Sequence, residues 1–172
     1  MLWHFQLSQG DLKKKQKGFS LIELLIVVAI ILIIAAIAIP NLMRARMSAN
    51  ESSAAGSLRT INTAEVSYAT TYPTTGFGTL LALGAPGPGA CTPSVATGCF
   101  IDWNLATNGG GAGKDGYTFT VTGVSLTGYT SLGNALTINQ TGTRSFCSNQ
   151  SGVIYYKAGA NGCSPTADVP LQ

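Results

Sequence analysis

The chain of 172 residues contains a single histidine, His4, and only 10% of its residues are charged. Because no histidine follows position 4, the rest of the chain cannot form a Ser-His-Asp or a Cys-His catalytic arrangement. The C-terminal part has three aspartates, Asp102, Asp115 and Asp168, which lie in unrelated loop-like stretches where simple surface solvation accounts for them. We therefore expect no enzymatic activity, no bound cofactor and no metal site.

The four cysteines all fall in the C-terminal part of the chain, and none forms a C-x-x-C pair with histidines nearby, which argues against zinc. An even number of cysteines is typical of disulfides in an oxidising compartment, and four free thiols in a cytosolic protein are the alternative. Three connectivities exist for four cysteines. We favour the one that joins neighbours in the sequence, Cys91 with Cys99 and Cys147 with Cys163.

Positive charge is concentrated at the N-terminus. The formal net charge of +3 comes from 10 basic and 7 acidic residues. Residues 1–18 hold four of the basic residues and one of the acidic ones, so the remaining chain has six of each. A neutral remainder gives no basis for nucleic-acid binding.

A near-continuous apolar run, FSLIELLIVVAIILIIAAIAI, extends over residues 19–39 and contains one charged residue, Glu23. At ~1.5 Å per residue, a helix of these 21 residues is about 30 Å long, which matches the hydrocarbon thickness of a bilayer. The run therefore predicts a membrane-spanning helix near the N-terminus. Four lysines precede it and two arginines follow it, which favours a cytoplasmic N-terminus and an exported C-terminal part.

An ordinary secretory signal is the alternative, because residues 36–38 (Ala-Ile-Ala) imitate a small-x-small cleavage site. The apolar run is longer than the usual apolar core of such a signal, it contains Glu23, and Pro40 stands two residues beyond the cleavage point. These features argue against removal of the whole run.

The segment KKKQKGFSLIELLIVVAIILIIAAIAIPNL, residues 13–42, resembles the N-terminal signature of type IV prepilins and of their relatives, the pseudopilins. Gly18 precedes the bond that is cleaved in this family, Phe19 becomes the new N-terminus, Glu23 is the acid four residues later, and Pro40 follows the apolar run. The resemblance implies that residues 1–18 are a leader peptide. It also implies that a prepilin peptidase in the inner membrane cleaves the Gly18–Phe19 bond and methylates the amine of Phe19.

Glu23 is costly in a bilayer, by ~2.5–3.5 kcal/mol near its centre and less at the interface, so it needs a partner. In a filament core the amine of Phe19 on one subunit can pair with Glu23 of its neighbour, and this pairing favours one axial stagger. Alternatively, Glu23 lies at headgroup level or is protonated. Pro40 has no N–H and is expected to kink or loosen the helix, or else to end it where the chain leaves the membrane.

Residues 41–72 show helical, amphipathic spacing, and Tyr72-Pro73 is expected to end the helix. Arg59, Asn62 and Thr63 are expected to face away from the apolar stripe. That stripe, which we expect to pack on the C-terminal domain, consists of Ala54, Leu58, Ile61, Ala64 or Glu65, Tyr68 and Tyr72.

The C-terminal domain, residues 73–172, begins with loops in which FGTLLALG, residues 77–84, is expected to form one helical turn. Alternating patterns predict strands at GYTFTVT (116–122), ALTIN (135–139) and GVIYYK (152–157), with RSFC (144–147) as strand or loop. The predicted fold is α+β: a long N-terminal helix, residues 19–72, packs on an antiparallel meander of three or four strands with disulfide-tied loops.

These features predict a pilin, a structural subunit that forms a helical homo-oligomeric filament for adhesion, motility or DNA uptake. The precursor is expected in the inner membrane, where it meets the prepilin peptidase and the assembly machinery, and the filament outside the cell. A pseudopilin of a type II secretion system is the alternative. Major pseudopilins tend to carry a calcium-binding acidic cluster where this chain has cysteines. A membrane-tethered periplasmic protein that does not polymerise would need neither Gly18 nor Glu23.

Overall fold

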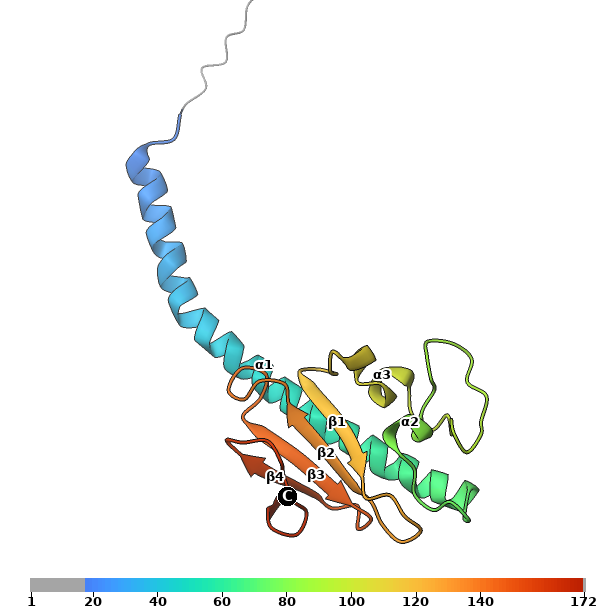
Figure 1. The fold of residues 1–172 in the computed structure, drawn as a ribbon. Helices are drawn as coiled ribbons and strands as arrows, with labels where there is room; N and C mark the ends of the chain where they lie inside the picture. Colours follow the sequence, from blue (N-terminus) through green and yellow to red (C-terminus); the bar gives the residue numbers. More distant parts are fainter. Residues whose placement is uncertain (1–17, 172) are drawn as a thin grey trace, which may run out of the picture. The chain divides into compact units, whose positions relative to one another are not determined.

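The computed structural model describes residues 18–171, so the predicted leader lies outside the described residues except for Gly18. The described chain contains one long helix, two helices of a single turn, a 3-10 turn and five strands (Figure 1). In chain order they are α1 (Leu21–Thr71), α2 (Leu80–Leu83), α3 (Trp103–Ala106), η1 (Gly109–Gly111), β1 (Tyr117–Thr122), β2 (Thr130–Ala135), β3 (Arg144–Asn149), β4 (Ile154–Ala158) and β5 (Val169–Pro170).

Helix α1 is continuous through Pro40 and ends at Thr71. The chain divides into two compact units, residues 1–39 and 40–172, with the boundary immediately before Pro40. The expectation that Pro40 ends the helix is therefore wrong, because residues 40–71 remain helical. The C-terminal end of α1, at Thr71, lies where Tyr72-Pro73 predicts it, because proline disfavours the helical conformation of the residue before it.

The strands form one antiparallel sheet in the order β1-β2-β3-β4-β5, a meander in which each strand pairs with the next along the chain. The first four strands are labelled in Figure 1. Tyr117 of β1 lies opposite Ala135 of β2, and Phe146 of β3 lies opposite Tyr156 of β4. The predicted fold class, a long helix on a small antiparallel sheet, is confirmed. The number of strands is five, because the C-terminal tail adds the short strand β5 beside Tyr155 and Tyr156.

One predicted strand is wrong. Residues 135–139 (ALTIN) contribute only Ala135 to the sheet, and β2 instead occupies Thr130–Ala135, where no strand is predicted before Ala135. Thr130–Ala135 contains Gly133 and Asn134, which are poor strand formers, yet pairing on both sides with β1 and β3 outweighs that preference. After Ala135 the chain turns, with Asn139 in the left-handed conformation.

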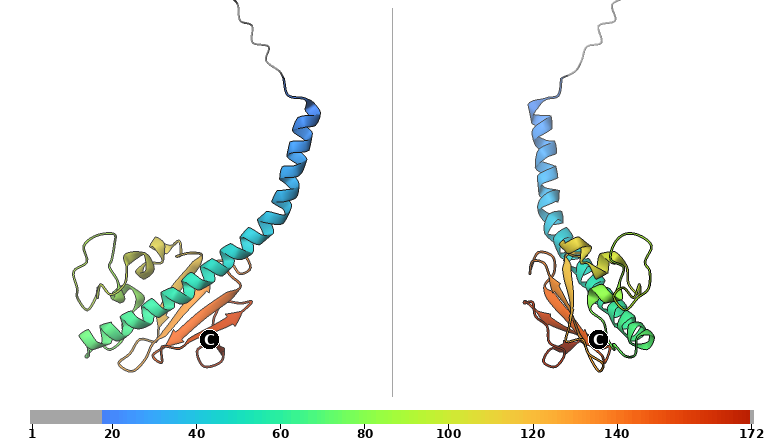
Figure 2. Two further views of the ribbon diagram at one scale, coloured as in Figure 1. Left: turned by 180° about the vertical axis from the view of Figure 1, so that it is seen from behind. Right: turned by 45° about the vertical axis from the view of Figure 1, so that its right-hand side comes forward.

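The core of the second unit lies between α1 and one face of the sheet. Figure 2 shows from two directions that the second half of α1 lies across this face. The predicted helix stripe is confirmed: its members from Ala54 to Tyr68 are buried and Tyr72 is partly buried. The main apolar side chains in this interface are Ala54, Leu58, Ile61, Ala64 and Tyr68 of the helix, and Tyr117, Phe119, Ala135, Phe146 and Ile154 of the sheet.

Asn62 departs from the prediction, because it faces the sheet instead of solvent. Its amide donates to the hydroxyl of Ser148 at 2.8 Å and accepts a hydrogen bond from the hydroxyl of Tyr129 at 3.0 Å. These bonds offset the cost of burying a polar amide in the core. Arg59 and Thr63 are exposed, as predicted.

The segment between α1 and the sheet contains the predicted helical turn, α2, which begins after Thr79 and packs beside α3. The hydroxyl of Thr79 caps α2, and a carboxylate oxygen of Asp102 caps α3 by accepting from the N–H of Leu105 at 3.0 Å. On the outer edge of β1, the side-chain amide of Asn108 both donates to the carbonyl of Phe119 and accepts from its N–H.

Gly56 allows a test of how glycine affects the stability of α1. A side-chain carbon added at this position meets no atom within 4 Å. Because glycine lowers helix stability relative to alanine, Gly56→Ala should stabilise the second unit by about 0.5–1 kcal/mol. Urea denaturation of the full chain in detergent, followed by circular dichroism, measures this change. Gly142→Ala is the contrast: its added carbon would overlap the buried hydroxyl of Tyr117, so it should destabilise the protein.

Candidate functional site

The first half of α1 presents apolar side chains on all of its sides. Fifteen large apolar residues between Phe19 and Ile39 are exposed, from Val28 at 46% to Phe19 at 82%. Within α1 an 18-residue window has a mean hydropathy of 3.3 and no buried residue, so the helix is long and apolar enough to cross a membrane. A signal sequence meets the same criteria. Such a surface requires cover by lipid or by protein, because burying each large apolar side chain is favourable by ~1.5–3 kcal/mol relative to leaving it in water.

The residues predicted to be cleaved precede this helix. Gly18, Phe19 and Ser20 are exposed and lie outside the helix, which begins at Leu21. A side-chain carbon added at Gly18 meets no atom within 4 Å. The Gly18–Phe19 bond is therefore accessible from solvent in the described chain.

Glu23 and Pro40 lie near the two ends of the apolar segment. Glu23 occupies the first turn of α1, where a carboxylate is favoured by the unpaired N–H groups and by the helix dipole. Within residues 18–171 Glu23 has neither an ion pair nor a side-chain hydrogen bond. At the other end, Pro40 lacks an N–H, so the helical hydrogen bond to the carbonyl of Ala36 cannot form.

A second polar site, missed by the sequence analysis, ties the helix to the sheet. The carboxylate of Glu51 accepts from the N–H and the hydroxyl of Thr143, both at 2.7 Å, and forms an ion pair with Arg144 at 2.7 Å. Burial opposes ionisation of Glu51, but the hydrogen bonds from Thr143 and Arg144 outweigh it and lower the pKa. Glu51 lies one turn before the predicted stripe. The apolar spacing therefore does not predict its burial, which depends on its contacts with Thr143 and Arg144.

Glu65 is buried without a charge partner. One carboxylate oxygen accepts from the N–H of Gly78 at 2.9 Å, and the other oxygen has no hydrogen-bond partner. Burial raises its pKa to about 7, an effect only partly opposed by the hydrogen bond from Gly78. The helical spacing predicts that Ala64 or Glu65 lies in the buried stripe, but it does not predict the hydrogen bond between Glu65 and Gly78.

The cysteines form two disulfides, Cys91–Cys99 and Cys147–Cys163. This is the pairing of sequence neighbours that the sequence analysis favours. Cys91–Cys99 closes the loop that precedes α3, and Cys147–Cys163 ties the C-terminal tail to the centre of β3.

The three aspartates have separate structural contacts. Asp102 caps α3, Asp115 accepts from Ser53 at 2.7 Å and pairs with Lys114 at 3.1 Å, and Asp168 accepts from the N–H of Ser164 at 2.6 Å. Within residues 18–171 no three His, Cys, Asp or Glu side chains lie close enough together to hold a metal ion. The unusual features of the described chain are therefore the exposed apolar segment and two buried carboxylates, Glu51 and Glu65.

The fold is thus a small disulfide-tied α+β domain on one long helix. The N-terminal segment of this helix is apolar on all sides and needs cover by lipid or by protein. A family model described as the prokaryotic N-terminal methylation motif matches residues 13–39. No solved structure matches the chain.

Two relatives match short stretches of the chain. The chain is 63% identical over 38 residues to the type IV wide pilus major component PilA4 of Thermus thermophilus, covering 22% of this chain and 29% of that protein. It is 48% identical over 54 residues to the type IV major pilin protein PilA of Myxococcus xanthus, covering 31% of this chain and 24% of that protein. The matches thus span less than a third of either relative. Together with the family model, they confirm the resemblance of this chain to type IV pilins.

Glu65 makes the stability of the second unit depend on pH. Its pKa in the folded chain, about 7, exceeds the ordinary value of 4.5, so the folded state binds more protons between these values. The free energy of unfolding should therefore fall as the pH rises from about 4.5 to about 7, by ~3 kcal/mol from this group.

Urea titrations of the full chain at several pH values test this dependence against Glu65→Gln, which cannot ionise. The variant should lose the downward slope between pH 5 and 7 and should be more stable than the wild type at pH 8. Parallel slopes for the two proteins would contradict the assignment of the slope to Glu65.

Proposed function

We propose that this protein is a pilin, the structural subunit of a type IV pilus filament, and that it is not an enzyme. The observation that carries the proposal is the exposed apolar segment of α1 with Glu23 in its first turn. The two relatives, which this chain matches over 38 and 54 residues, are named as major pilus components, which supports the same role here. Their remaining length is not matched, so the proposal rests on the N-terminal helix.

Residues 1–18 act as a leader peptide that prepilin peptidase removes at the inner membrane. The exposure of Gly18 and Phe19, and their position outside the helix, suit a protease that requires an extended substrate. Methylation of the amine of Phe19 follows cleavage. The mature chain then consists of the long helix, residues 19–72, and the C-terminal domain, residues 73–172.

The apolar segment has two successive environments. In the precursor it spans the inner membrane, with the N-terminus in the cytoplasm and the C-terminal domain outside. In the filament the same side chains pack against other copies of the helix. Removing fifteen large side chains from lipid into water would cost on the order of 20–40 kcal/mol, so the segment leaves the bilayer only where other copies cover it.

Glu23 sets the stagger between copies. Two opposite charges 4 Å apart attract by about 4 kcal/mol at an effective dielectric constant of 20, and an unpaired buried charge costs several kcal/mol. The amine of Phe19 on one subunit and Glu23 of its neighbour satisfy each other in the filament core. A copy shifted along the axis would leave both charges unpaired.

The processed N-terminus can be measured directly. Mass spectrometry of filaments sheared from the cell surface should find this chain as the main component, beginning at N-methylated Phe19. Filaments that contain residues 1–18 would contradict the processing. The chain's absence from sheared filaments would favour a pseudopilin or an anchored monomer.

The charge pairing predicts an assembly defect without an insertion defect. Glu23→Gln and Glu23→Ala should insert into the inner membrane as the wild type does, but should lower the yield of sheared filaments more than tenfold. Glu23→Asp, which keeps the charge on a shorter side chain, is the matched control and should retain more assembly. A normal yield from Glu23→Gln would remove the pairing argument.

A further inference from the structure

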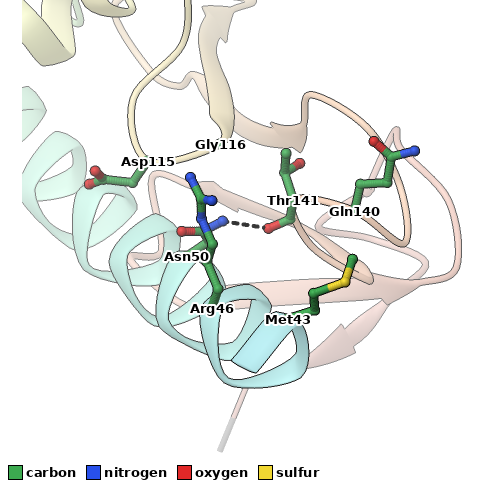
Figure 3. A pocket seen from close by; sticks show the side chains of 7 residues that line it. All are labelled: Met43, Arg46, Asn50, Asp115, Gly116, Gln140 and Thr141. Atoms are coloured by element: carbon green, nitrogen blue, oxygen red, sulfur yellow. Dashed lines mark hydrogen bonds between the residues drawn. The ribbon is translucent and has the colours of Figure 1, made fainter. Parts of the chain in front are cut away.

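A surface cavity of about 530 Å³ lies at the start of the second unit (Figure 3). Met43, Arg46 and Asn50 line it from α1, and residues 115–116 and 140–141 line it from two loops. The amide of Asn50 donates to the carbonyl of Thr141 at 2.9 Å and so ties the helix to the second loop. The helix and the loops thus form the walls of the cavity within one unit.

Arg46 supplies the free charge of this cavity. Its side chain stands beside Asn50 and points toward the space between the loops (Figure 3). Among residues 18–171 it forms no ion pair and no side-chain hydrogen bond. The nearby Asp115 is already compensated, because it pairs with Lys114 at 3.1 Å and accepts from Ser53. The cavity therefore carries one uncompensated cation and should attract an anion.

The other walls are suited to an amphipathic ligand. Met43 offers an apolar wall and is 52% exposed. Asn50 and Gln140 offer amide groups that can bond to hydroxyls, and the Gln140 side chain is exposed. An inorganic anion would use only Arg46. A molecule with a phosphate, hydroxyls and an apolar end would use the cation, the amides and Met43 together.

The position of the cavity along the chain points to the source of such a ligand. Met43 and Arg46 follow Pro40 by three and six residues, or ~5 and ~9 Å along a helix. The polar headgroup region extends roughly 5–8 Å beyond the hydrocarbon core on each side of a bilayer. If residues 19–39 span the membrane, as the proposed function requires, these distances along the helix place Met43 and Arg46 at the level of the headgroups.

We propose that this cavity binds the headgroup of an anionic phospholipid. The phosphate lies on the guanidinium of Arg46, the headgroup hydroxyls bond to Asn50 and Gln140, and the glycerol and the start of the acyl chains contact Met43. The occupied cavity holds the C-terminal domain against the bilayer before assembly. Because this inference rests on the proposed membrane insertion, it applies to the precursor and to the processed monomer.

The test uses the full chain, labelled with ¹⁵N and held in micelles of a nonionic detergent. The probe is a short-chain phosphatidylglycerol, and the readout is the NMR shift of the backbone amides of Gly116 and Thr141. Both amides should shift to saturation. Arg46→Gln should weaken binding about tenfold, the usual effect of losing one charge-assisted contact. Arg46→Lys should weaken it less.

Arg44→Gln is the matched control, because Arg44 is exposed at a similar depth but does not line the cavity. It should change the affinity less than twofold. Equal weakening by Arg44→Gln would overturn the site in favour of a general surface charge. The amide of Phe146, in the core, should keep its shift in each variant, which establishes that the variants fold.

Two further arms identify the ligand. Glycerol phosphate, which lacks acyl chains, should bind at least tenfold more weakly than the lipid, and equal binding would overturn the lipid site in favour of a simple anion site. Shifts that grow with protein concentration in the absence of lipid would assign the cavity to a second copy of the chain. Neither arm measures filaments, so a negative result here is distinguishable from failure of the pilin proposal.

Discussion

A single helix has to satisfy two different surroundings, and the rest of the structure depends on this constraint. Over residues 19–39 the helix is apolar on every side, so the described chain alone leaves it uncovered. Over residues 51–68 it buries one side, which packs on the sheet. The second unit must therefore be stable without any contribution from the first half of the helix. It achieves this with one continuous core and two disulfides.

Three buried polar residues fix the helix on the rest of the second unit. Glu51 binds the start of β3, Asn62 binds Ser148 near its end, and Glu65 binds the segment that precedes α2. Apolar contacts alone tolerate small shifts along the helix axis, whereas each hydrogen bond is lost by such a shift and leaves a buried polar group unsatisfied. The three contacts thus set the position of the helix. At Glu65 this leaves one carboxylate oxygen buried without a hydrogen-bond partner.

The sequence predicts the features that repeat along the chain. The apolar run, the helix stripe and the alternation in β1 are long patterns with a clear period, and each is confirmed in the structure. The sequence pattern does not predict the position of β2, because Gly133 and Asn134 are poor strand formers and the strand depends on pairing with β1 and β3. The apolar spacing does not predict the burial of Asn62 or the role of Glu51, because both depend on partners 67 to 93 residues away in the sequence. The cavity at Arg46 likewise requires loops from two distant segments.

The contacts of Asn108 have a consequence for the edge of the sheet. β1 is an edge strand, and an open edge is a template for pairing with another chain. Here Asn108 occupies the polar groups of Phe119, and the backbone of Lys114 occupies those of Tyr117. Most of the edge is therefore already paired within the chain. This edge of the sheet therefore offers few free N–H and C=O groups with which a strand of another chain could pair.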